Sequence, residues 1–127
     1  MKIIVGYDGS KSAATAVEAA KKRALESGAE VVVVTSLMVP DTVVEKKAEA
    51  ELAGVVECFK DTGITVKTEL LVRGLDPGED LEKYAEENNV DEIVIGLRKR
   101  SKVGKILFGS TAQYVILNMK CPVVVVK

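Results

Sequence analysis

Short apolar runs alternate along this chain with longer segments in which apolar residues recur every three or four positions. The runs at 2–7, 31–36, 65–72, 92–96 and 122–126 are rich in Val and Ile, and several of them show no alternation of apolar and polar residues. Runs of this length and composition predict β-strands. A strand without polar alternation is typical of a parallel sheet that helices cover on both faces.

Four helices are predicted between these strands, over about 10–27, 40–61, 76–89 and 109–119. In the first of them, small apolar residues fall on one face, and a glycine follows where a helix C-cap belongs. Strand and helix alternate from one end of the chain to the other. This order predicts a single α/β domain over residues 1–127, with a five-stranded, doubly wound, mostly parallel sheet and helices on both faces.

Composition narrows the chemistry that this domain can perform. The 127 residues include 18 Lys and Arg, 19 Asp and Glu, and no His. Without His, neither a Ser-His-Asp triad nor a Cys-His pair can form within the chain. The net charge of −1 also argues against binding nucleic acid through the whole surface, because that affinity comes from cations that displace phosphate counterions. We therefore expect no nucleic acid partner.

The cysteines and the apolar segments bear on the cellular location. Cys58 and Cys121 lie far apart and have neither His nor CxxC companions, so we expect no zinc site and no disulfide. Both are predicted to be reduced, small residues of the core. No stretch approaches the ~20 apolar residues that span a bilayer, and the chain begins directly with a strand-like segment. We expect a cytoplasmic protein that does not enter a membrane.

The segment after the fourth predicted strand is the most unusual in the sequence. Five cations occur among eight residues without an acid, and Gly109-Ser110-Thr111 follows where a helix begins. The cations are Arg98, Lys99, Arg100, Lys102 and Lys105. One interpretation is a solvated surface turn. The other is a phosphate-binding loop, which the position favours, because ligands of an open parallel sheet bind beyond the carboxyl ends of its strands and a helix amino terminus attracts anions.

Known motifs fit these residues poorly. Gly104-Lys105 resembles the end of a P-loop, but Ile106 stands where Ser or Thr is required, and no G-x-G-x-x-G follows the first strand. The third strand ends without the Asp that a receiver-type phosphoacceptor domain needs. Asp8, after the first strand, has two interpretations: an N-cap of the first helix, or a group that holds a ribose hydroxyl or Mg²⁺ beside phosphates.

Five segments carry a family resemblance, in the same order along the whole chain. They are Val5–Ser10, Gly74–Pro77, Asp91–Gly96, Phe108–Thr111 and Cys121–Val126. They resemble the universal stress protein family, which implies a Rossmann-like, adenine nucleotide alpha hydrolase-like fold with strand order 3-2-1-4-5. The resemblance also implies a cytoplasmic stress-response or signalling role, and ATP or AMP as a ligand in some members. It further implies a homodimer in which the final strands meet through Val123, Val124, Val125 and Val126.

Nucleotide-binding members of that family carry the motif G-x2-G-x9-G-[ST] after the fourth strand. Gly96, Gly109 and Ser110 fit that spacing, whereas Lys99 stands at the second glycine position. This lysine either obstructs the site or supplies a compensating charge. The resemblance implies that Asp8 holds the ribose and Mg²⁺ and that Ser36 edges the adenine. The implied nucleotide-binding residues are Gly6, Tyr7, Asp8, Ser36, Gly96, Arg98, Lys99, Gly109, Ser110 and Thr111.

The sequence therefore predicts a regulatory module that binds an adenine nucleotide at the carboxyl ends of its first and fourth strands, without catalytic residues. One alternative is a slow ATP hydrolase or phosphotransferase in which Asp8 and Mg²⁺ position the attacking group, although the sequence shows no convincing general base. The other alternative is a ligand-free dimer whose basic loop contacts an acidic protein or nucleic acid, with steep salt dependence.

Overall fold

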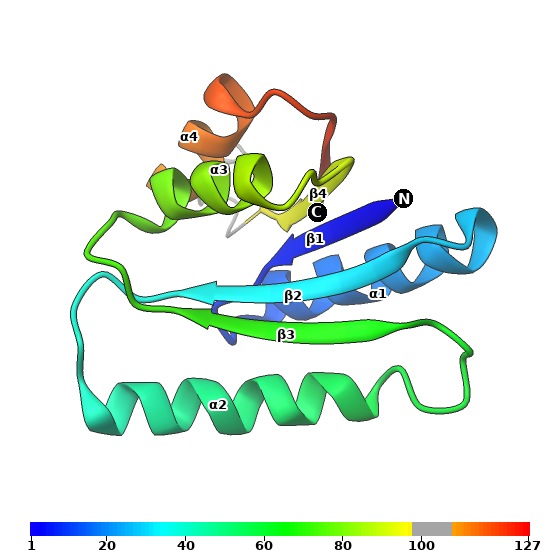
Figure 1. Ribbon diagram of the computed structural model, residues 1–127, viewed down its shortest axis with the longest axis horizontal. Helices are drawn as coiled ribbons and strands as arrows, with labels where there is room; N and C mark the ends of the chain where they lie inside the picture. The colour runs from blue at the N-terminus through cyan, green and yellow to red at the C-terminus, as the bar shows by residue number, and fades with distance from the viewer. Residues whose placement is uncertain (98–107) are drawn as a thin grey trace, which may run out of the picture.

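The computed structural model describes residues 1–97 and 108–127, in which strands and helices alternate along the chain (Figure 1). The elements are β1 (Lys2–Gly6), α1 (Lys11–Ser27), β2 (Glu30–Ser36), α2 (Thr42–Glu57), β3 (Val66–Leu71), α3 (Pro77–Glu87), β4 (Glu92–Gly96), α4 (Ser110–Asn118) and β5 (Val123–Val126). The predicted alternation of strands and helices is confirmed.

The five strands form one parallel sheet in the predicted order β3-β2-β1-β4-β5. The chain first builds outward from β1 to β3, and then crosses to the other side of β1 for β4 and β5. The direction of building therefore reverses between β1 and β4. Ligands of open parallel sheets bind at the carboxyl ends of the strands on either side of such a reversal.

Two apolar cores lie on opposite faces of the sheet, because successive side chains of a strand point to opposite sides. Ile3 and Val5 of β1 pack with α1 and α2, whereas Ile4 between them packs with α3 and α4. Figure 1 shows these two pairs of helices on opposite sides of the strands. β2 is buried from Val31 to Thr35. The absence of polar alternation thus correctly indicated a strand covered on both faces.

The second helix ends earlier than its apolar spacing predicted. α2 stops at Glu57, and the next residues form a turn in which Cys58, Phe59 and Lys60 donate backbone hydrogen bonds three positions back. Asp61 then takes a left-handed conformation with φ 62°. Phe59 is nevertheless buried in the core beneath α1 and α2. The turn therefore keeps an apolar contact at the position that the helical spacing had predicted.

The prediction that both cysteines are core residues is wrong for Cys58. This residue is exposed because the chain leaves the helix at that point and Phe59 takes the buried position beside it. Cys121 is half-buried and packs against the core under α3 and α4. Burial raises the pKa of its thiol. Both thiols are free, as the sequence predicted.

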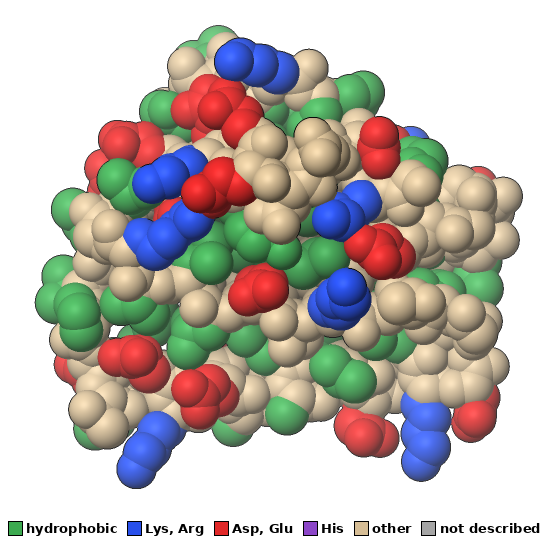
Figure 2. Space-filling view, viewed as in Figure 1, with side chains coloured by type: hydrophobic (Ala, Val, Ile, Leu, Met, Phe, Trp, Pro, Cys, Tyr) green, Lys and Arg blue, Asp and Glu red, His purple; other side chains and the backbone are tan. Residues whose placement is uncertain are grey.

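Charged side chains of both signs are interspersed on the face shown in Figure 2, with apolar side chains between them. Within residues 1–97 and 108–127, no helix combines the length and the apolar composition that a membrane crossing requires.

Candidate functional site

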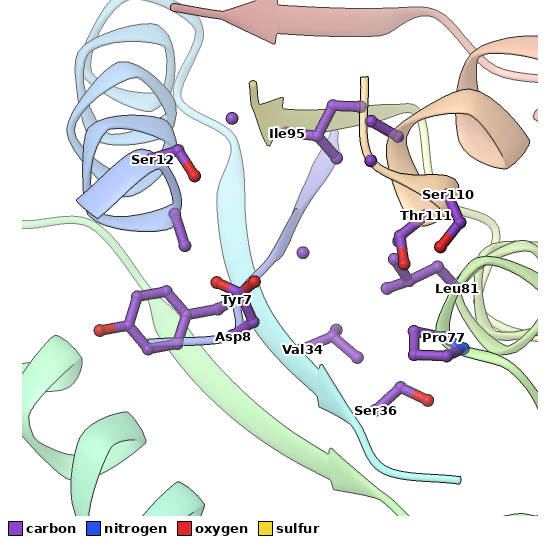
Figure 3. Close-up of a pocket in the computed structure, with 15 residues that line it drawn as sticks. Tyr7, Asp8, Ser12, Val34, Ser36, Pro77, Leu81, Ile95, Ser110 and Thr111 are labelled. Carbon is purple, nitrogen blue, oxygen red and sulfur yellow. The ribbon is translucent and has the colours of Figure 1, made fainter. Parts of the chain in front are cut away.

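A pocket of about 150 Å³ lies at the carboxyl ends of β1 and β4, where the direction of sheet building reverses (Figure 3). It is bordered by the amino-terminal ends of α1, α3 and α4. The structure brings to this pocket every predicted site residue that lies within the described ranges. These residues are Gly6, Tyr7, Asp8, Ser36, Gly96, Gly109, Ser110 and Thr111. The other two, Arg98 and Lys99, lie outside the described residues.

Gly6 and Gly96 allow the strand ends to approach their neighbours closely. A Cβ atom at Gly96 would collide with the backbone carbonyl of Ser12 in the first turn of α1. A Cβ atom at Gly6 would lie 3.2 Å from Leu81 Cδ1 of α3, which is tighter than an ordinary contact. Both glycines therefore have a packing role that is independent of any ligand.

Asp8 supports the start of α1 indirectly, through hydrogen bonds to Ser10. Its Oδ1 accepts hydrogen bonds from the Ser10 backbone N–H, at 3.0 Å, and from Ser10 Oγ. Ser10 itself is the N-cap, because its Oγ accepts from the Ala13 N–H at 3.2 Å. The interpretation of Asp8 as the N-cap is thus wrong: Asp8 orients the residue that caps the helix. Its carboxylate is exposed at the mouth of the pocket, as Figure 3 shows.

Tyr7 borders the pocket, but its ring points away from the cavity in Figure 3 and packs against the core beneath α1 and α2. Burial, followed by the nearby negative charge of Glu51, raises the pKa of its phenol. The backbone of Tyr7 is fixed by β2, because its N–H donates to Val34 O at 2.9 Å and its carbonyl accepts from Thr35 Oγ1 at 2.8 Å. These bonds hold the end of β1 in position.

The amino terminus of α4 forms the wall opposite Asp8. Gly109 is the N-cap and supplies no side-chain hydrogen bond to the first amides of the helix. Ser110 and Thr111 follow in the first turn, and Figure 3 shows their hydroxyl groups directed toward the cavity. Backbone N–H groups at a helix start carry partial positive charge, which favours an anion. This end of the pocket is therefore suited to phosphate.

Part of the pocket wall is apolar. Val34 and Leu81 are buried, and Pro77 lies at the first position of α3 beside them. Figure 3 shows Val34 and Pro77 near Ser36, and Leu81 between Pro77 and Thr111. An apolar wall with a few polar groups at its edges is typical of small-molecule sites.

Asp80 is a residue that the sequence analysis missed. It lies in the first turn of α3 with none of its surface exposed, and its Oδ2 accepts a 2.7 Å hydrogen bond from Ser36 Oγ. Its Oδ1 accepts from Arg73 Nε at 2.6 Å, and Arg73 also donates to Glu87 at 2.6 Å. Although partial burial opposes it, the hydrogen bonds to Glu87 and Asp80 raise the pKa of Arg73.

Comparison with known proteins assigns this chain and its fold to a family. Residues 1–127 match the sequence profile of the Universal stress protein family. The chain belongs to that family. This confirms the resemblance inferred from the five segments and accounts for the strand order.

Two relatives and one solved structure illustrate the match. A universal stress protein from Thermus aquaticus is 34% identical over 134 residues, which cover 98% of this chain and 97% of the relative. Universal stress protein MJ0531 from Methanocaldococcus jannaschii is 34% identical over 83 residues, 65% of this chain and only 48% of its own length. A universal stress protein from Archaeoglobus fulgidus, solved in complex with dAMP, superposes with a TM-score of 0.86 at 32% identity, covering 100% of this chain and 98% of that one.

Within this universal stress protein, the described residues show no cluster of three or more metal-ligating side chains among Cys, Asp and Glu. Asp8 supplies the carboxylate among the residues that line the pocket. Mg²⁺ at nucleotide sites is commonly held by one or two carboxylates together with the phosphates of the ligand. The donor set around Asp8 therefore fits a metal that arrives with a nucleotide, and not a metal held by the protein alone.

Proposed function

We propose that this universal stress protein is a cytoplasmic regulatory module that binds an adenine nucleotide, ATP or AMP, at the carboxyl ends of β1 and β4. The observation that carries the proposal is that one pocket combines an anion-favouring helix start with apolar side chains on its walls. The relative from Archaeoglobus fulgidus in complex with dAMP supports it, because that chain shares the fold over its whole length.

Different residues around the pocket would hold different parts of the ligand. The phosphates would lie against the first amides of α4 and the hydroxyls of Ser110 and Thr111, with Lys99 and Arg98 supplying positive charge. The ribose would lie near Asp8, whose carboxylate would also hold Mg²⁺ together with the phosphates. The base would lie against Val34, Pro77 and Leu81, with Ser36 at its edge. The chain's contribution is therefore to bind and orient the nucleotide.

We also propose that two copies pair through β5. This strand is at one edge of the sheet and consists of four valines. The side chain of Val125 is 38% exposed, and Ile116 and Leu117 of α4, the helix that precedes β5 in the chain, are exposed as well. An apolar edge strand is a template for pairing with a second chain.

Nucleotide release and titration test the binding proposal. Mass spectrometry of small molecules released from freshly purified protein is expected to detect an adenine nucleotide. In calorimetric titrations, affinity is expected to rise from adenosine through AMP to Mg²⁺-ATP, because each phosphate adds charge that the start of α4 and Lys99 can bind.

A pair of matched variants locates the binding. Asp8→Asn is expected to weaken Mg²⁺-ATP about tenfold, since a charge-assisted bond contributes more than a neutral one. Asp61→Asn removes the same charge at a distant exposed turn, where φ is 62° and Asn is well tolerated, and is expected to leave binding unchanged. If neither the wild-type protein nor Lys99→Gly binds any adenine nucleotide, the proposal is wrong and a ligand-free interaction dimer replaces it.

A further inference from the structure

The Ser36 hydroxyl has a fixed hydrogen-bonding direction at the edge of the pocket. Its proton is donated to Asp80 Oδ2 at 2.7 Å. A hydroxyl has one proton and two acceptor lone pairs, so the proton is already used within the protein. Within residues 1–97 and 108–127, no donor is bonded to this oxygen. The side of Ser36 that borders the pocket therefore offers lone pairs to a ligand.

Asp80 cannot act as the donor in its hydrogen bond with Ser36. Its side chain is completely buried, and both of its oxygens accept hydrogen bonds, one from Ser36 and one from the Arg73 guanidinium. As the carboxylate partner of an ion pair, Asp80 has no proton to donate back to Ser36. Arg73 is in turn held by Glu87 at 2.6 Å. The direction of the Ser36 hydrogen bond is thus determined by buried Asp80 and its partner Arg73, neither of which lines the pocket.

The groups beside Ser36 indicate which part of a ligand meets it. Val34 and Leu81 are buried apolar side chains that line the pocket together with Pro77. Flat apolar surface is suited to the faces of a ring system, whereas a polar atom at its border can bond only to the ring edge. A ligand edge that lies against Ser36 must donate a hydrogen, because an acceptor there would face the hydroxyl lone pairs.

We propose that Ser36, oriented by Asp80, is a specificity-determining acceptor that selects a purine carrying an amino group on its edge over a purine without one. This inference rests on the proposed nucleotide binding and specifies which base the same site takes. Adenine carries such a group at ring position 6. Asp80 acts through Ser36 and is a positioning residue.

The experiment compares two ligands that differ only in that group: AMP and the purine ribonucleotide that has hydrogen in place of the 6-amino group. Calorimetric or competition titrations give their affinities for the same protein sample. The wild-type chain is expected to prefer AMP about threefold to tenfold, the range of one hydrogen bond. The ratio is informative because any loss of folded protein affects both ligands equally.

Three variants assign the preference to Ser36. Ser36→Ala is expected to reduce the ratio to near one by weakening AMP and leaving the unsubstituted purine unchanged. Asp80→Asn should also abolish the preference, because an amide at position 80 can donate to Ser36 and free the hydroxyl proton to face the pocket. Ser27→Ala makes the same change at an exposed residue in the last turn of α1, far from the pocket, where the hydroxyl bonds to Arg23 O, and should retain the wild-type ratio.

The outcomes separate this inference from the function on which it rests. Binding of both ligands by the wild-type protein with equal affinity, or an unchanged ratio in Ser36→Ala, overturns the acceptor role and leaves nucleotide binding standing. Absence of binding for both ligands, in the wild-type protein and in all three variants, overturns the proposed function and this inference with it.

Discussion

Gly96 at the end of β4 and Ser12 in the first turn of α1 lie so close that a Cβ atom at position 96 would overlap the Ser12 carbonyl. The overlap involves backbone on both sides, so no side-chain rotation can relieve it. The family resemblance makes this glycine the first of three in a nucleotide-binding motif. In this chain the same residue is also required for two elements to pack.

Gly96→Ala is therefore expected to lower the free energy of unfolding even without ligand, by about 1–3 kcal/mol, the usual cost of overpacking. Chemical denaturation of the ligand-free protein measures it. Gly54→Ala is the matched control: Gly54 lies on the exposed side of α2 with open space around its Cα. This second change should stabilise the protein by about 0.5–1 kcal/mol. Equal stability of Gly96→Ala and the wild-type protein would contradict the packing role.

The charge at Lys99 is expected to strengthen binding of phosphates. Lys99→Ala should weaken Mg²⁺-ATP by about one to two decades, the value of a charge-assisted bond, and leave adenosine unaffected. Ser110→Ala should cost less, because a neutral hydroxyl contributes only about 0.5–1.5 kcal/mol. Lys120→Ala, which removes the same charge from an exposed residue paired with Glu86, is the control. Tighter binding by Lys99→Gly would show instead that the lysine obstructs the site.

Tyr114 is expected to make stability decrease at high pH. Its hydroxyl donates to Glu82 at 2.6 Å, and this hydrogen bond raises the pKa of the phenol from 10.0 to about 12. The folded state therefore keeps a proton that the unfolded state loses. This contribution is fully present below pH 10 and is lost as the pH rises through about 12.

Site-specific ¹³C labelling of tyrosine, with the Tyr114→Phe variant for assignment, measures that pKa by NMR. Glu82→Gln should bring it back toward 10.0, the ordinary value, because the negative charge that opposes ionisation is removed. Glu57→Gln, at the distant end of α2, should leave it unchanged. A Tyr114 titration at the ordinary value in the wild-type protein would refute the coupling to Glu82.

Pairing through β5 is expected to be disrupted by a charge on its exposed side. Val124→Lys should shift the equilibrium toward monomer, but Val124 also packs against the core beneath α1 and α2. Val125→Lys is the cleaner variant, because Val125 is 38% exposed. Val43→Lys, at a 78% exposed position of α2, should leave the assembly unchanged. Analytical ultracentrifugation at micromolar concentration measures the result, and a monomeric wild-type protein would exclude the β5 dimer.

The two-sided core could be predicted because it depends on local apolar patterns, whereas the strand order came from the family resemblance. Uninterrupted valines in β2 require cover on both faces, and the structure supplies it. The end of α2 could not be predicted from spacing. Phe59 is buried at the position that a longer helix would have buried, although its backbone is already in the turn after α2. Cys58 was placed in the core for the same reason, and is exposed.

The candidate pocket was predicted more completely than the bonds within it. Asp8, Ser36 and Ser110 were expected at one edge because parallel strands end there together, and all three border the pocket. The bond between Ser36 and Asp80 joins residues 44 positions apart, and no local pattern specifies it. A usable signal was present in Arg73, a cation two residues after the end of β3, which requires a carboxylate partner when it is partly buried.

Ile3, Ile4 and Val5 place β1 in both apolar cores at once. Neither pair of helices can detach without exposing one side of this central strand. The two halves of the structure described for residues 1–97 and 108–127 should therefore not open independently. Unfolding should therefore be a single cooperative transition. Amide hydrogens of β1 should exchange with solvent only through global unfolding, more slowly than those of the edge strands β3 and β5.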